Sequence, residues 1–234
     1  TEMVFNALAA ATPHNILAGS GGTPAQTNIF YGRRHNGKPW HTMIIRGGGL
    51  GASSRRDGHH CAIFPANGAN TPVEIFESDT PLIVSERGLV ADSGGPGRMR
   101  GGLGRKMAIE VPDDEFGPQP PVTVAVQAGR FRYPPEGLFG GCPGSKARFE
   151  RNRQPADPSG LTHCQRGDVI EFRSAGGGGY GEPFERDPEA VESDVANGYV
   201  SIERAREDYG VVINRGTLKV DPDATLRLRE DSRR

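Results

Sequence analysis

Several features that often reveal a protein's class are weak or missing in this sequence. Aromatic residues make up 7% of it, and 28 Lys and Arg are balanced by 29 Asp and Glu. This balance provides neither the basic field that attracts nucleic acid nor a basic amphipathic run for a membrane surface. No apolar stretch approaches the roughly 20 residues of a membrane-spanning helix, and the N-terminus lacks the pattern of a secretory signal. We therefore expect a cytoplasmic protein that binds neither nucleic acid nor membrane.

Paired cysteines are also missing. Cys61, Cys142 and Cys164 are odd in number and far apart, and none belongs to a C-x-x-C motif. This usage fits a reducing compartment better than a secreted module held by disulfides. The first residue is Thr1 rather than Met, so we consider a split or trimmed polypeptide that is the C-terminal piece of a longer protein.

The common catalytic signatures are absent as well. The sequence has no G-x-x-x-x-G-K-[ST] phosphate-binding loop, no G-x-G-x-x-G after a strand, no G-x-S-x-G and no S-x-x-K. It therefore indicates no ATP site and no activated nucleophile of its own.

Glycine and proline, in contrast, are abundant, with 34 and 19 residues, and no tandem repeat organises them. A helix is predicted over 2–11, ended by Pro13. Short β-branched or alternating runs bounded by turn residues then predict strands, at 27–31, 40–45, 73–76, 82–84, 106–111, 122–126 and 169–172. The fold class is predicted as α+β, mainly β.

The C-terminal region has a different pattern. Helices are predicted from the N-cap Asp187 to Gly198 and from Ser201 to Gly210, followed by a hairpin over 211–220 and a last polar helix. We divide the chain into a β-rich body (1–174), a glycine-rich hinge (175–183) and a small helical and hairpin tail (184–234). The hinge glycines either flex or let the backbone pass close to a neighbouring segment.

The most unusual stretch is 92–105, where six glycines and one proline separate three arginines. Such a run predicts repeated turns rather than a helix or a central strand. Arg98, Arg100 and Arg105 would then lie with Asp92 on a shaped loop, which is a candidate anion or partner site. The alternative is a plain connection between strands whose arginines are solvated.

Two further polar clusters precede that loop. Asp57 with His59 or His60 could hold a metal in a turn, or Asp57 could simply cap the turn. Asn67 and Asn70 lie in a second cluster whose free backbone N–H groups could bind an anion or a carbonyl oxygen. The alternative is that both asparagines satisfy tight turns.

These clusters resemble one known family, the B subunit of ATP-dependent hydantoinases, which also forms half of 5-oxoprolinase. Acetone and acetophenone carboxylases are similar at a greater distance. The resemblance covers nearly the whole chain, in six ordered blocks at 47–58, 70–74, 92–104, 137–144, 176–189 and 198–212.

The resemblance implies an enzyme subunit that is inactive alone. Relatives are longer, and these blocks are similar to their C-terminal half; the family's metal-binding G-G-x-H-x-x-D stretch belongs to the N-terminal half. The expected partners are an ATP-binding A subunit, which would carry ATP and Mg, and that N-terminal half, which could carry a divalent metal, in a hetero-oligomer. This chain itself would bind no cofactor and no metal.

The activity implied is ATP-dependent hydrolysis of a cyclic amide, such as a hydantoin, 5-oxoproline or a lactam, through a phosphorylated intermediate. The candidate pocket residues are Asp57, Asn67, Asn70, Asp92, Arg98 and Arg100. Two alternatives stay open. The chain could be a noncatalytic assembly domain that docks the ATP-binding subunit, or a subunit of a related ATP-dependent carboxylase.

Overall fold

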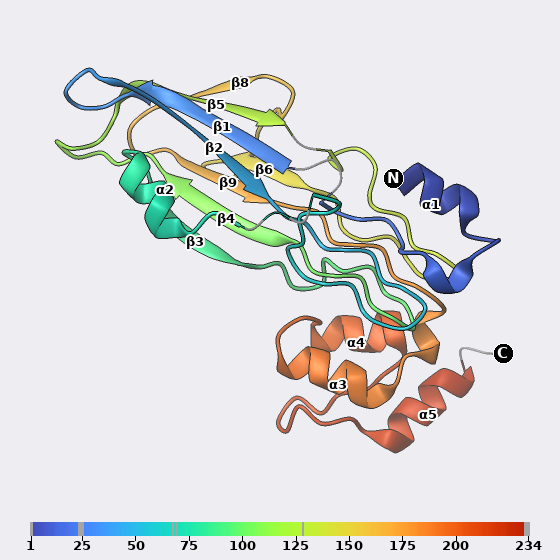
Figure 1. The fold of residues 1–234 in the computed structure, drawn as a ribbon. Coiled ribbons are helices and arrows are strands. Elements are labelled where there is room, and N and C mark those ends of the chain that lie inside the picture. The colour runs from blue at the N-terminus through green and yellow to red at the C-terminus, as the bar shows by residue number, and fades with distance from the viewer. Residues whose placement is uncertain (1, 23–25, 67, 69, 128, 232–234) are drawn as a thin grey trace.

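The computed structural model describes residues 2–22, 26–66, 68, 70–127 and 129–231. The strands form two antiparallel sheets that face each other (Figure 1). One sheet has the order β2 (Pro39–Arg46), β1 (Gln26–Arg33), β5 (Gln119–Gln127), β8 (Leu161–Cys164). The other has the order β3 (Ile83–Leu89), β4 (Arg105–Glu110), β9 (Val169–Arg173), β6 (Arg148–Arg151), β7 (Gln154–Pro155). With the helices described below, this confirms the predicted α+β class.

Side chains from the two inner faces form the main hydrophobic core. Phe30 of β1 is fully buried and meets Phe172 of β9 edge to face, with ring centroids 6.1 Å apart. Along β2, Trp40 and Ile44 are buried while Met43 is exposed, which is the alternation of a strand with one face on a core. Burying a side chain of this size contributes about 1.5–3 kcal/mol, so the inner faces hold the sheets together.

One predicted strand is wrong. Residues 73–76 belong to helix α2 (Val73–Asp79), which follows Pro72 and ends where the Thr80 amide donates to the Phe76 carbonyl oxygen. Phe76 is its one buried residue, with its ring centroid 5.8 Å from that of Phe30. Strand propensity fails here because a short surface helix that buries a single aromatic residue fits the end of the sandwich.

Other boundaries also differ from the sequence prediction. Helix α1 spans Glu2–Leu8, and a 3-10 turn follows at Pro13–Asn15. Strands β6, β7 and β8 were not predicted, because two to four residues give little periodicity to read. Of the predicted hairpin at 211–220, the structure has an isolated bridge between Ile213 and Val220.

The tail contains the predicted helices. Asp187 caps α3 (Pro188–Ala196) by accepting from the Glu189 amide, and Ser201 caps α4 (Ile202–Tyr209) by accepting from the Arg204 amide. A 3-10 turn at Pro183–Glu185 precedes α3, and α5 (Pro222–Asp231) ends the described chain. A second core joins α3, α4 and the segment that follows α4, and it consists of Val191, Val195, Val200, Ala205, Tyr209, Val211 and Ile213. Within the described ranges, no helix has the length and apolar character to cross a membrane.

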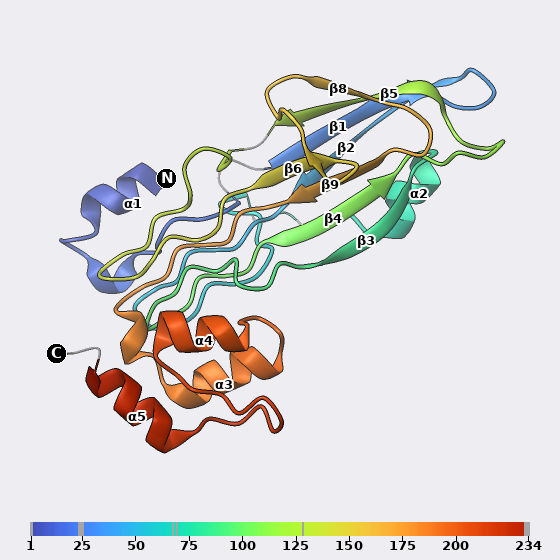
Figure 2. The same ribbon diagram turned by 180° about the vertical axis from the view of Figure 1, so that it is seen from behind.

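Between the sheets and the tail, extended segments from distant parts of the chain run side by side (Figures 1 and 2). We call them the glycine bundle, and it comprises residues 18–22, 47–51, 94–104, 137–144 and 176–181. A Cβ added at Gly49 would lie 1.8 Å from the Gly102 carbonyl oxygen, and one at Gly177 would lie 2.1 Å from that of Leu50. Backbones therefore approach each other more closely than any side chain permits.

The centre of the bundle is the segment predicted as a hinge. Gly177 donates from its amide to Gly102 and accepts at its carbonyl oxygen from the Gly95 amide, both at 2.8 Å, and the Gly178 amide donates to the Gly19 carbonyl oxygen. The structure therefore shows glycines 176–179 in the second of the two predicted roles, in which the backbone passes close to neighbouring segments. These residues are buried. The division into body and tail stays a prediction.

Within 92–105 the chain turns or bends at residues 92, 94, 97 and 98, and Asp92 has a φ of 59°, but the glycines of this stretch are not left-handed. Among the described glycines, those with positive φ are Gly37, Gly140, Gly167, Gly181, Gly198 and Gly210, and none lies in this stretch. Its glycines are needed because they lack a Cβ, not because they adopt left-handed backbone. Neighbouring segments satisfy their N–H and C=O groups, as buried backbone requires.

We predict that Gly49→Ala lowers the free energy of unfolding by about 3 kcal/mol or more, because backbone on both sides must move. Gly88→Ala on β3 is the matched control, since its added Cβ would meet nothing within 4 Å. Urea unfolding followed by circular dichroism compares the two variants. Equal stability of both would contradict the close-packed bundle.

Candidate functional site

Where the glycine bundle meets the tail, two arginines and two aspartates form a buried ion cluster. Asp57 and Arg100 come from loops at the bundle end, whereas Arg186 precedes α3 and Asp194 lies on it. Arg100 and Arg186 are each only 3% exposed. Guanidinium groups at this depth require carboxylate partners, because an unpaired buried charge is costly.

Both carboxylates of the ion cluster accept hydrogen bonds from arginine side chains. Arg186 donates from Nη1 and Nη2 to the two Asp57 oxygens at 2.8 and 2.7 Å, and from Nη2 to Asp194 at 2.8 Å. Arg100 donates from Nε and Nη2 to the Asp194 carboxylate at 3.1 Å each, and its amide donates to Asp57 at 2.6 Å. The cluster thus connects the bundle to the tail by charge-assisted hydrogen bonds.

These contacts shift two pKa values. Burial alone would raise the pKa of Asp57, but the hydrogen bond and charge of Arg186, with the charge of Arg100, lower it. Burial, followed by the charge of Arg100, lowers the pKa of His60. His60 accepts at Nδ1 from the Leu103 amide at 2.9 Å, which requires a neutral ring with its proton on Nε2. His60 therefore supports the backbone.

The remaining candidates lie in different places. Asp92 accepts a hydrogen bond from the Ser201 amide at 2.7 Å, so it also contacts the tail. Arg98 donates from Nη2 to the Ser54 carbonyl oxygen at 3.3 Å. Asn67 lies outside the described residues. Asp57 and Arg100 therefore contact each other and the tail, whereas Asp92 contacts the tail separately, at Ser201.

Asn70 belongs to a second polar group, at the edge of the sandwich. Its Oδ1 accepts from Arg105 Nη1 at 2.8 Å, and Arg105 is 5% exposed. Near Arg105 lies Arg46, which is 2% exposed and donates from Nη2 to Asn28 at 3.0 Å. We call Arg46 and Arg105 the arginine pair. In the ion cluster carboxylates balance the arginines, whereas amide oxygens accept from the arginine pair.

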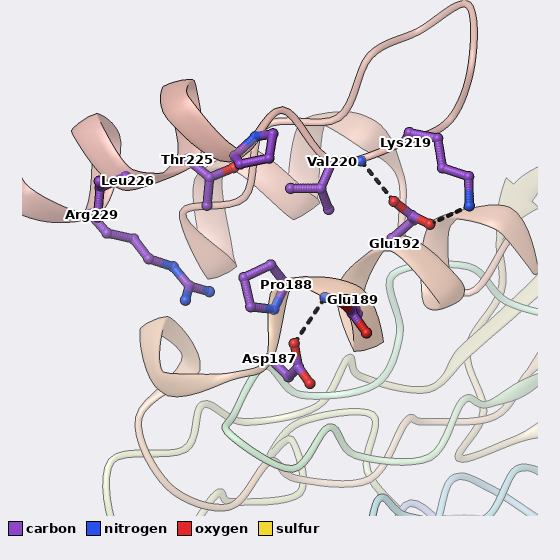
Figure 3. Close-up of a pocket in the computed structure, with 10 residues that line it drawn as sticks. Asp187, Pro188, Glu189, Glu192, Lys219, Val220, Thr225, Leu226 and Arg229 are labelled. Atoms are coloured by element: carbon purple, nitrogen blue, oxygen red, sulfur yellow. Dashed lines mark hydrogen bonds and ion pairs between the residues drawn. The ribbon is translucent and has the colours of Figure 1, made fainter.

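A cavity of about 930 Å³ lies in the tail, and no side chain of the ion cluster or of the arginine pair is among its lining residues. It is lined by Asp187, Pro188, Glu189, Glu192, Lys219, Val220, Pro222, Thr225, Leu226 and Arg229 (Figure 3). Polar groups on its wall bond one another: Lys219 donates from Nζ to Glu192 Oε1 at 2.6 Å, and the Val220 amide donates to Oε2 at 2.8 Å. In the part of the chain that the structure describes, no three His, Cys, Asp or Glu side chains are placed to hold a metal ion.

Sequence reasoning placed Arg105 on the candidate loop at 92–105 but not among the pocket residues, and it selected none of Arg186, Asp194 and Arg46. Three of these residues adjoin glycine-rich blocks that the sequence does reveal: Arg46 precedes Gly47, Arg105 follows Gly104, and Arg186 follows the block at 176–181. A charged residue next to close-packed backbone was the available signal, because backbone this dense buries its neighbours. Asp194, within a helix, carried no such signal.

Apart from Arg186 Nε, which has no partner among the described residues, every guanidinium nitrogen of the ion cluster is hydrogen-bonded. A substrate anion would have to displace Asp57 or Asp194 to reach Arg186, and Asp57 already accepts three hydrogen bonds. In this chain the cluster therefore joins the tail to the glycine bundle. The bundle and the sandwich it extends define a rigid scaffold whose buried charged groups lie at its edges.

Comparison with known proteins identifies this scaffold. The family model described as Hydantoinase B/oxoprolinase matches residues 1–183, so the chain belongs to that family. A protein of Pseudomonas sp. (strain NS671), provisionally named as the B subunit of a D-/L-hydantoinase, is 32% identical over 98% of this chain and 38% of its own length. The chain thus spans well under half the length of that relative.

Solved structures agree. The ATP-dependent caprolactamase of Pseudomonas jessenii has a TM-score of 0.76 and 27% identity, over 96% of this chain and 40% of that one. Nucleotide-free acetone carboxylase has a TM-score of 0.79 over 97% of this chain and 35% of that one; at 23% identity it shows the fold alone.

We predict that Asp57→Asn lowers the free energy of unfolding at pH 7 by about 1–2 kcal/mol, less than the loss of a fully buried pair because this carboxylate is one-third exposed. A lowered folded-state pKa contributes stability above the unfolded-state value of about 3.9, and that stability is lost as the pH falls further. The deficit of the variant should therefore shrink below about pH 4. Urea titrations between pH 2.5 and 7 measure it.

The control is Asp113→Asn, an exposed carboxyl, which should follow the unmodified chain at every pH. A deficit of Asp57→Asn that stays constant down to pH 2.5 would show that its charge is not the stabilising feature.

Proposed function

We propose that this chain is the C-terminal part of a hydantoinase B type subunit, which acts with an ATP-binding A subunit to hydrolyse a cyclic amide in the cytoplasm. The observation that carries the proposal is the family match over residues 1–183. The caprolactamase relative, named for a lactam, supports a cyclic amide as the substrate class.

The proposed reaction needs a phosphoryl donor and groups that hold the anionic intermediate. Supplying these two from different chains is consistent with a multi-chain enzyme. An amide carbonyl resists water because it is electron-rich, and phosphorylation of its oxygen supplies a better leaving group. The phosphoryl donor would be ATP with Mg on the A subunit, and a divalent metal would belong to the N-terminal half of the B subunit. The chain's own contribution would be a scaffold with a positively charged group at one edge, the arginine pair, that helps to place the anionic intermediate.

A second candidate, a noncatalytic assembly domain, is favoured by one observation. The ion cluster is occupied by its own carboxylates, so Asp57 and Arg100 would keep the tail in place for docking rather than contact substrate. In the proposed enzyme, Arg98 is the candidate with most freedom to reach a substrate, since its side chain makes one long hydrogen bond, of 3.3 Å, to the described residues.

Arg98→Ala in the assembled complex separates these functions. If the chain takes part in catalysis, we expect kcat/KM for ATP-coupled ring opening to fall about tenfold or more, while association of the chains is unchanged. The measurement pairs ADP release with ring-opened product over hydantoin, 5-oxoproline and caprolactam, and with carboxylated product from acetone and acetophenone.

Arg148→Ala is the matched control, because Arg148 is an exposed arginine on β6. Unchanged turnover of Arg98→Ala in a correctly assembled complex would favour the assembly domain. Carboxylated product alone would identify a carboxylase subunit. The isolated 234-residue chain is expected to hydrolyse no ATP, and turnover by it would contradict the proposal.

A further inference from the structure

The arginine pair lies in a concentration of buried hydrogen-bond donors without acceptors. Among the described residues, seven buried side-chain atoms have no hydrogen-bond partner. Four of them belong to this group: Asn28 Nδ2, Arg46 Nε, Arg46 Nη1 and Arg105 Nε. All four can only donate. A buried donor that bonds nothing costs about 1–3 kcal/mol, so four in one place indicate a missing acceptor.

Packing fixes the position of Arg46. It ends β2, its guanidinium carbon lies 4.5 Å from the centre of the Phe172 ring, and Nη2 donates to Asn28 Oδ1. Asn28 is itself fully buried. The ring and the amide hold the guanidinium in place while Nε and Nη1 remain free to donate.

Arg105 extends the positive charge toward the surface. It begins β4, and its Nη1 donates to Asn70. Its neighbour Arg87, on β3, is exposed and donates to the Thr71 carbonyl oxygen at 3.3 Å. Burial and then the charge of Arg87 lower the pKa of Arg105 to about 10, and burial and then Arg105 lower that of Arg46 to about 9. Three positive charges therefore lead from solvent to the buried donors.

The chain itself supplies no counter-charge. All 29 Asp and Glu lie among the described residues, and in this part of the chain none forms an ion pair with Arg46, Arg87 or Arg105. The thiol of Cys61 lies near Arg105 and Arg87, but burial raises its pKa, so it stays neutral at pH 7. Two nearly fully buried arginines thus repel each other without compensation.

We infer that Asn28, Arg46 and Arg105 form a binding site for a small oxyanion of the phosphate or carboxylate type. An oxyanion offers several acceptor oxygens and a negative charge, which are the two things the group lacks. A metal cation is excluded by the charge of the arginines. Arg87 attracts the anion at the surface, and Asn70 positions Arg105. The inference does not depend on the proposed function.

The test uses the full 234-residue chain with inorganic phosphate, and with acetate as the carboxylate probe, against chloride at matched ionic strength. About 20 mM phosphate should raise the midpoint of thermal unfolding by about 2 °C or more, as a ligand of the folded state does. Arg46→Met and Arg105→Met should each abolish this shift. Arg148→Met, which removes an exposed arginine, should retain it.

A second measurement needs no variant that might misfold. In ¹H–¹⁵N spectra of arginine side chains, the Nε–H signals of Arg46 and Arg105 should move on titration with phosphate while that of Arg148 stays fixed. The larger response, to phosphate or to acetate, identifies the preferred oxyanion. The proposal is overturned if neither anion moves these signals, or if Arg46→Met retains the full thermal shift. It is also overturned if the signals respond only when a partner chain is added, since a partner carboxylate would then occupy the group.

Discussion

Contact between backbones without intervening side chains is the constraint on which the other features depend. β2 ends at Arg46 and the chain enters the glycine bundle at Gly47; β9 ends at Arg173 and the chain enters it at Gly176. The bundle returns the chain to the sandwich at Arg105, where β4 begins. The positions of the strand ends, and of the arginines on them, are therefore set by how closely the glycine segments approach.

Two groups of arginines at the borders of the bundle show opposite electrostatic states. Arg100 and Arg186 are balanced by Asp57 and Asp194, so their cost of burial is offset within the chain. Arg46 and Arg105 are buried to a similar degree, and among the described residues their side chains have amide and ring partners but no carboxylate. The first arrangement is what joining two parts of a fold requires. The second is what recognition of an external group requires, because compensation must come from outside.

Much of this fold could be predicted from the sequence, for identifiable reasons. The tail helices were readable because Asp187 and Ser201 cap them and Gly210 ends one of them, all of which are local signals. Helix α2 was misread because the burial of Phe76 against Phe30 is a long-range contact. The glycines of 94–104 suggested turns because the sequence shows that a side chain is absent but not which segment fills the space.

The site was less predictable for the same reason: Asp57 and Arg100 are 43 residues apart, and Arg100 and Asp194 are 94 apart, so their contact depends on the complete fold. What distinguishes Arg46 and Arg105 from the other buried arginines of the described chain is that neither pairs with a carboxylate, which only the folded chain reveals.

The central place of residues 176–181 has a consequence for how the molecule is made. This segment is the last of the bundle to be synthesised, yet it bonds to segments near residues 19, 52, 95, 102 and 142. Domains generally fold as units during synthesis, and contacts between distant residues form slowly. The hydrogen bonds of the glycine bundle cannot all form until residue 181 has left the ribosome. The earlier segments of the bundle therefore emerge with their backbone groups still bonded to water.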